Sequence, residues 1–202
     1  MLSYDEFKTK INESLNERYN NYQWIKKLES KYLTSGILFF HNPRILYDAA
    51  KCSYMNGCFL SVIPIIYNTI EQFLLCKSQF FKYNEDSQND KSISTTKYLK
   101  LKHTPASSKI FEDALKYKII DKELKREIEV FKKIRNETMH AKSPGHYKIL
   151  GGPYDWKSDS WEIPEELVDT IGIKPSAKKG LELFLKILQF NIKQRNIGII
   201  SI

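Results

Sequence analysis

The chain has few cysteines, and it lacks the motifs that would identify several common classes of protein. Its 202 residues contain three cysteines, at positions 52, 58 and 76, with neither paired spacing nor a Cys-x-x-Cys motif. An odd, unpaired set argues against a disulfide framework and against a cysteine zinc site. We therefore expect buried, reduced thiols in a cytoplasmic protein.

Targeting and membrane signals are also scarce. The N-terminus MLSYDEFKTK is charged and amphipathic, which is not the pattern of a signal peptide. One stretch, residues 52–70, has no charged residue, but Pro64 and several polar residues interrupt it and Glu71 follows at once. We interpret this stretch as a buried core helix and expect no membrane partner.

The composition is that of a folded and basic protein. Hydrophobic residues make up 42% of the chain, charged residues of both signs make up 28%, and the net charge is +8. These values favour a packed core over disorder, and the length suits a single domain over residues 1–202. A basic chain is compatible with a polyanionic partner, although charge alone is weak evidence for one.

Apolar spacing predicts helices along most of the sequence. A first helix should occupy residues 1–35 and end at Thr34-Ser35-Gly36, and a long apolar helix should run over 46–75 with a kink or break at Pro64. We expect a loop over 84–106, a short helix over about 107–118, a helix capped by Asp121, and a last helix opened by Pro175. Residues 146–164, with Gly-Gly-Pro and two tryptophans, predict a β-hairpin or an ordered loop.

The most informative motif lies in the helix that follows Asp121. Arg135 is followed by Asn136 and, five positions after the arginine, by His140. Arginine presents a planar charged fork that fits phosphate oxygens, and histidine titrates near neutral pH. With no metal motif elsewhere, these side chains predict metal-free attack on a phosphodiester.

Each of these residues also has a purely structural interpretation. Arg135 falls on the apolar face of its helix, where it would extend its charged end to solvent or pair with Glu71 or another acid. His140 lies near a helix end, where a solvated and partly charged histidine is favoured in any case.

Arg135, Asn136 and His140 together resemble the signature of the HEPN superfamily, Arg-x4–6-His with a polar residue after the arginine. The segment DAAKCSYMNGCFLSVIPIIYNTIEQFLL is similar to the long core helix of that family, including an acid at Glu71. The resemblance covers roughly residues 43–195. It implies an all-α, up-and-down helical bundle that dimerises with its motif helices facing each other. In catalytic members this pairing forms a metal-independent endoribonuclease site that needs no cofactor.

The resemblance assigns roles to individual residues. Arg135, Asn136 and His140 would be catalytic, Glu71 would support the site, and RNA would be the substrate. Such a protein would be a toxin or an anti-phage defence effector with an antitoxin or defence-system partner. Toxins of this superfamily that pair with a nucleotidyltransferase antitoxin often carry Tyr two residues after the His, where this chain has Lys142. The resemblance therefore does not extend to regulation by modification of that tyrosine.

A basic segment adds a candidate RNA contact. Residues 91–118 contain seven lysines against Glu112 and Asp113. Lys97, Lys100 and Lys102, together with Lys142, are candidates for binding the RNA backbone, and a solvated loop with scattered lysines is the alternative. Two other functions remain open, a non-catalytic HEPN module that binds nucleotide, RNA or protein, and a bundle with a purely structural role.

Overall fold

The structure is a computed structural model that describes residues 4–33, 41–89, 105–139 and 172–196. Within these residues it contains six helices and no strand, which confirms the all-α prediction. The helices are α1 (Tyr4–Tyr32), α2 (His41–Met55), α3 (Phe59–Asn89), α5 (Ser107–Lys116), α6 (Lys122–Met139) and α9 (Ile173–Asn196). The predicted hairpin at 146–164 lies outside the described residues.

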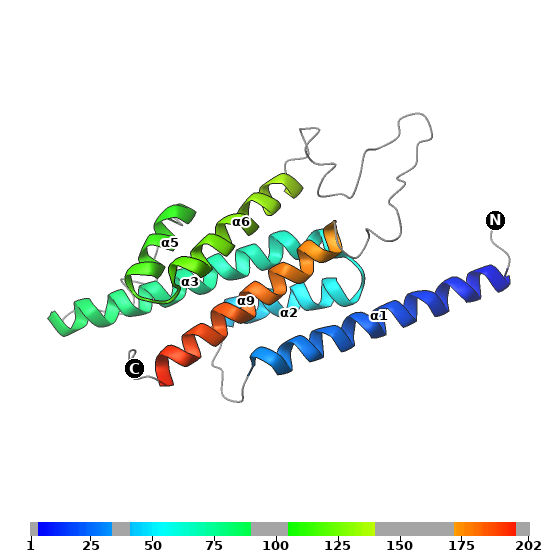
Figure 1. The fold of residues 1–202 in the computed structure, drawn as a ribbon, viewed down its shortest axis with the longest axis horizontal. Coiled ribbons are helices and arrows are strands. Elements are labelled where there is room, and N and C mark those ends of the chain that lie inside the picture. The colour runs from blue at the N-terminus through cyan, green and yellow to red at the C-terminus, as the bar shows by residue number, and fades with distance from the viewer. Residues whose placement is uncertain (1–3, 34–40, 90–104, 140–171, 197–202) are drawn as a thin grey trace.

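Helix α3 is the centre of the bundle. It contacts α2, α5, α6 and α9, whereas α1 packs only against α2 and α9 among the helix pairs with substantial contact (Figure 1). Side chains from its apolar run are fully buried, among them Ile63, Ile66, Ile70 and Leu74. Burial of this run accounts for its lack of charge, because burying each such apolar side chain stabilises the fold by about 1.5–3 kcal/mol.

The long apolar helix is interrupted, but at Gly57 and not at Pro64 as predicted. Gly57 has φ of +77°, a left-handed conformation that glycine adopts without steric cost, and α3 begins two residues later. Pro64 lies inside α3 near its beginning. Its missing N–H removes the hydrogen bond to the carbonyl of Leu60, a residue exposed to water.

The C-terminal end of α3 also differs from the prediction of a loop from residue 84. The helix continues to Asn89, because it gains tertiary contacts that local sequence does not reveal. Phe81 stacks on Tyr117 with ring centroids 5.9 Å apart, and Tyr117 Oη donates a hydrogen bond to Glu85 at 3.0 Å. The polar sequence of residues 84–89 therefore continues the helix, with Glu85 and Gln88 exposed and residues 84, 86 and 87 half-buried.

Three helices approach one another most closely at Gly180 in α9. A Cβ atom built at this position would lie 2.4 Å from Phe131 of α6 and 2.7 Å from Ile66 of α3. A larger residue would collide with these side chains, so the position requires glycine. Its absence of a side chain lets the Phe131 ring and the Ile66 side chain fill the centre of the bundle. Around it α9 buries Leu181, Phe184, Leu185 and Leu188, as its apolar spacing predicts.

The long apolar helix of the bundle has the length and composition of a possible membrane span. Among the described helices, the segment Phe59–Gln88 is long and apolar enough to cross a membrane, and 44% of its most apolar window is buried in this fold. Core helices of soluble proteins pass the same test.

The expectation of buried cysteines is wrong for two of the three, because Cys52 and Cys58 are exposed and only Cys76 is half-buried.

Candidate active site

The motif helix α6 is positioned by a cap and an apolar face. Asp121 Oδ1 accepts a hydrogen bond from the backbone N–H of Leu124 at 2.8 Å, as expected for an N-cap residue. Leu124, Ile128 and Phe131 are buried, and Ile134 packs against the same core. The predicted apolar face is therefore confirmed, and it fixes the rotation of α6 about its axis.

Arg135 lies one turn beyond Phe131, against α3. Its guanidinium carbon is 5.3 Å from the ring centroid of Tyr67, and its Nη1 donates a hydrogen bond to Asn136 Oδ1 at 2.9 Å. Its Nε is buried and has no hydrogen-bond partner among the described residues. These residues also include no ion pair between Arg135 and Glu71, so the arginine is held by an aromatic ring and by its neighbour on the helix.

Glu71 lies near this arginine but is engaged by a different helix. Ser107 Oγ, on the first residue of α5, donates a short hydrogen bond to Glu71 Oε1. The carboxylate therefore lies at the N-terminal end of α5, where the helix dipole favours a negative charge. Glu71 therefore links α3 to α5, and among the described residues it makes no direct bond to Arg135.

Tyr67 joins the arginine to this pair. The side chain is only 2% exposed, and its pKa is raised above the usual value, chiefly by burial. The Ser107 hydroxyl opposes the increase, the Glu71 carboxylate adds to it, and the Arg135 charge lowers it. Tyr67 Oη is near enough for all three groups to change its pKa, yet it makes no well-aligned hydrogen bond to any described residue.

Three helices thus contribute to one polar cluster of five side chains, which we call the Arg135 cluster: Tyr67, Glu71, Ser107, Arg135 and Asn136. The sequence predicted three of them. Tyr67 was missed although it lies four residues before Glu71, a spacing that puts both on one face of α3. Ser107 carried no signal, because only the tertiary fold brings α5 to this position.

Several predicted site residues cannot be placed. His140, Lys97, Lys100, Lys102 and Lys142 all lie outside the described residues, and α6 is described as far as Met139. The sequence alone puts His140 four residues after Asn136 and directly after the end of the described helix. Their roles stay predictions.

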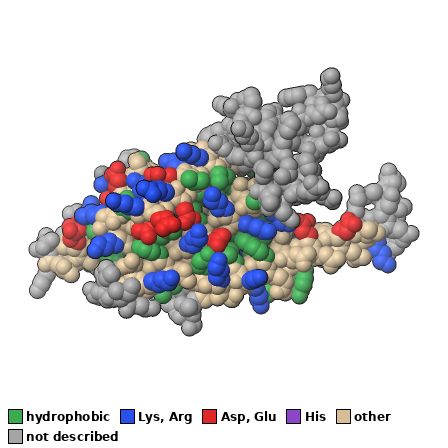
Figure 2. All heavy atoms as spheres, in the orientation of Figure 1, with side chains coloured by type: hydrophobic (Ala, Val, Ile, Leu, Met, Phe, Trp, Pro, Cys, Tyr) green, Lys and Arg blue, Asp and Glu red, His purple; other side chains and the backbone are tan. Residues whose placement is uncertain are grey.

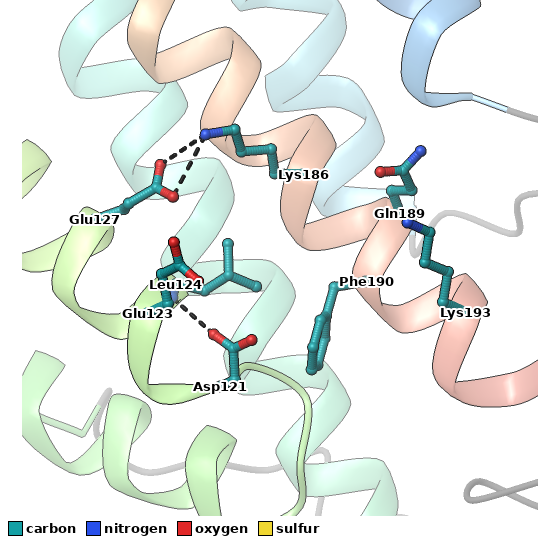
Figure 3. A pocket seen from close by; sticks show the side chains of 8 residues that line it. All are labelled: Asp121, Glu123, Leu124, Glu127, Lys186, Gln189, Phe190 and Lys193. Atoms are coloured by element: carbon teal, nitrogen blue, oxygen red, sulfur yellow. Dashed lines mark hydrogen bonds and ion pairs between the residues drawn. The ribbon is translucent and has the colours of Figure 1, made fainter. Parts of the chain in front are cut away.

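The structure also has a hollow away from the motif, between α6 and α9 (Figure 3). Its volume is about 260 Å³, and its lining combines acidic and basic side chains with Phe190. Lys186 Nζ is 3.0 Å from Glu127 Oε2, and this carboxylate raises the pKa of the lysine. The three carboxylates of the lining, Asp121, Glu123 and Glu127, outnumber its two lysines, Lys186 and Lys193, so the hollow is poorly suited to hold a phosphate.

No protein-family model, curated protein or solved structure matches this chain. Within the described residues no three His, Cys, Asp or Glu side chains gather into a candidate metal site. The functional argument therefore depends on the Arg135 cluster and on the motif that continues beyond it.

Proposed function

We propose that this protein is a HEPN-type endoribonuclease that cleaves RNA by attack of the ribose 2′-OH, without a metal ion. The observation that carries the proposal is the Arg135–Asn136 pair in the last turns of α6, directly before His140. Arg135 and Asn136 are half-buried and hydrogen-bonded to each other, and Arg135 packs on Tyr67. A guanidinium ordered before substrate binds loses less side-chain entropy on meeting a phosphate.

Each motif residue has a proposed part in the reaction. His140 removes the proton of the 2′-OH or protonates the leaving 5′-oxygen, since its ordinary pKa lies near neutrality. Arg135 stabilises the negative charge that develops on the phosphate. Asn136 orients His140 from one turn away or donates to a phosphate oxygen. The product is a 2′,3′-cyclic phosphate, and DNA, which has no 2′-OH, is not cut.

A homodimer completes the proposal. Acid–base catalysis needs two proton-transferring groups, and a two-fold dimer with facing motif helices supplies two copies of His140. We extend the proposal to a toxin or defence effector whose activity is held in check by an antitoxin or another component of the system. The lysines at 97, 100, 102 and 142 would then bind the RNA backbone.

The test is cleavage of total RNA by purified protein in EDTA, with analysis of the fragment ends. Wild type should produce 2′,3′-cyclic phosphate ends, and His140→Ala should reduce the rate by about 10²- to 10⁴-fold. His146→Ala removes a nearby histidine with no proposed role and serves as the matched control. Wild-type protein that is folded and dimeric but cuts no RNA would count against the proposal.

The second candidate is a non-catalytic module in which Arg135 is structural. The buried Nε of Arg135 and the packing on Tyr67 favour it, since both suit an arginine that ties α6 to α3. Arg135→Ala separates the two functions. If it abolishes cleavage while the thermal midpoint and the molecular mass stay unchanged, the catalytic role holds; if it unfolds the protein or dissociates the dimer, the structural role holds.

A further inference from the structure

Helix α1 extends well past the bundle on which it packs. Asn21 Nδ2 donates a hydrogen bond to the carbonyl of Tyr54, next to the last residue of α2. One turn earlier on the same side, Glu17 forms a 3.4 Å ion pair with Lys174, at the beginning of α9. The turns of α1 before Glu17 therefore stand clear of the other described helices, as an arm about 20 Å long (Figures 1 and 2).

This arm and the turns that follow it carry a row of exposed apolar side chains, which we call the α1 stripe. Its members and their exposed fractions are Ile11 (43%), Leu15 (56%), Tyr19 (61%) and Tyr22 (39%). The side chains that α1 buries against the bundle are Asn21, Ile25, Leu28 and Tyr32. At 100° per residue the two sets lie roughly 100° apart around the helix, so bundle packing does not explain the stripe.

The positively and negatively charged side chains of α1 also lie on different sides of the helix. Lys8, Arg18 and Lys26 lie beside the stripe, and the Lys26 ammonium is 5.2 Å from the ring centroid of Tyr22. The acidic residues between Lys8 and Lys26 are Glu13 and Glu17, and both lie nearly opposite the stripe. Arg18 and Lys26 border this exposed tyrosine pair, and the next acid on that side, Glu29, already pairs with Lys51 at 3.0 Å. Such a surface is complementary to a ligand that has both flat rings and negative charge.

We propose that the α1 stripe binds a single-stranded segment of RNA. Tyr19 and Tyr22, one turn apart, stack on successive unpaired bases, and Lys8, Arg18 and Lys26 contact the phosphates. Ile11 and Leu15 extend the apolar surface along the arm. The choice of RNA over other single strands rests on the proposed function, because stacking and phosphate contacts by themselves do not read the 2′-OH.

Binding is measured by fluorescence anisotropy with a labelled 2′-O-methyl oligouridine of about 15 nucleotides, within the usual site size for single strands. This probe has no free 2′-OH, so the protein cannot cleave it and binding is read without catalysis. The double variant Tyr19→Ala/Tyr22→Ala should raise Kd by at least about tenfold, whereas Tyr19→Phe/Tyr22→Phe should keep most of the affinity. Both tyrosines are exposed, so circular dichroism and the thermal midpoint should not change.

Two adjacent lysines provide a matched test of the proposed contacts with the phosphates. Lys26 borders the stripe and Lys27, also exposed, points away from it. Lys26→Gln should reduce the slope of log Kd against log salt by about 0.7, the value for one phosphate contact on a single strand, and Lys27→Gln should leave the slope unchanged. Equal reductions for both would show non-specific attraction to a basic protein and overturn the proposal.

Two other results would also overturn it. Unchanged binding by Tyr19→Ala/Tyr22→Ala would show that the stripe does not contact the oligonucleotide, even if the protein cuts RNA. Conversion of a dimer into a monomer by Leu15→Asp, measured by sedimentation, would show that the stripe is an interface between two copies. Loss of binding in the tyrosine variant of a protein that never cuts RNA would support the stripe and count against the ribonuclease.

Discussion

Helix α6 packs on α3, α5 and α9, and its two halves differ in the side chains that they bring to the bundle. The first half contributes Leu124, Ile128 and Phe131, all buried and apolar. The second half contributes Arg135, Asn136 and Thr138, which are half-buried and polar. Burial of polar groups is costly unless each is paired, and the Arg135 Nε has no hydrogen-bond partner among the described residues. We infer that the first half of α6 stabilises the fold. The second half retains polar side chains, whose burial costs free energy, because they take part in the proposed chemistry.

The largest effect that this comparison predicts is on stability, in the first half. Phe131 is fully buried where α3, α6 and α9 meet, and Phe131→Ala should lower the free energy of unfolding by about 3–5 kcal/mol. Its neighbour Val130 is 45% exposed, and Val130→Ala should change the same quantity by about 0.5 kcal/mol or less. Urea unfolding followed by circular dichroism measures both. Similar losses for the two variants would show that the apolar face of α6 is wrongly assigned.

The next effect concerns the support of the second half. Ser107→Ala removes the hydrogen bond to the Glu71 carboxylate, and a bond to a charged group contributes about 1.5–3 kcal/mol. The site is partly open, so we expect the lower end of that range. In a double-mutant cycle with Glu71→Ala, which removes the accepting carboxylate, the two changes should be non-additive, because each removes the same interaction. Additive losses would mean that Ser107 and Glu71 act separately.

The comparison also shows what sequence can predict and where it fails. The helices, the apolar face of α6 and the Asp121 cap follow from local spacing, because each depends on residues close together in the chain. The break at Gly57 and the extension of α3 to Asn89 were missed, since they depend on a backbone conformation and on a distant ring, Tyr117. For the site, Arg135, Asn136 and Glu71 were named from the motif and the resemblance. Ser107 was missed because only tertiary packing brings it there.

A smaller effect is expected at the N-terminal end of α6. Asp121→Ala removes the side-chain acceptor for the N–H of Leu124 and should lower the free energy of unfolding by about 1 kcal/mol. Asp121→Asn keeps a capping oxygen and should be nearly neutral by comparison. Urea unfolding distinguishes the two. If Asn were as destabilising as Ala, the charge of Asp121 and not its hydrogen bond would be the stabilising feature.

The smallest effect at neutral pH is expected at Tyr67, which touches both halves. Its ring centroid is 6.4 Å from that of Phe131 and its ring packs on Arg135. Tyr67→Phe keeps both ring contacts and removes a hydroxyl that makes no well-aligned hydrogen bond to the described residues, so the free energy of unfolding should change little at pH 7. The cleavage rate, if the hydroxyl has no part in chemistry, should also be close to wild type.

Alkaline pH should separate Tyr67→Phe from wild type. Burial raises the pKa of Tyr67 in the folded protein above 10.0, its ordinary value. The stabilising contribution of the protonated phenol is therefore complete below pH 10 and is lost as the pH rises through the folded pKa, since the unfolded chain ionises first. Wild type should lose stability above pH 10 more steeply than Tyr67→Phe, in thermal unfolding recorded from pH 8 to 11. Parallel curves would mean that Tyr67 ionises as readily in the fold as outside it, and that the polar groups of the second half, not burial, control this tyrosine.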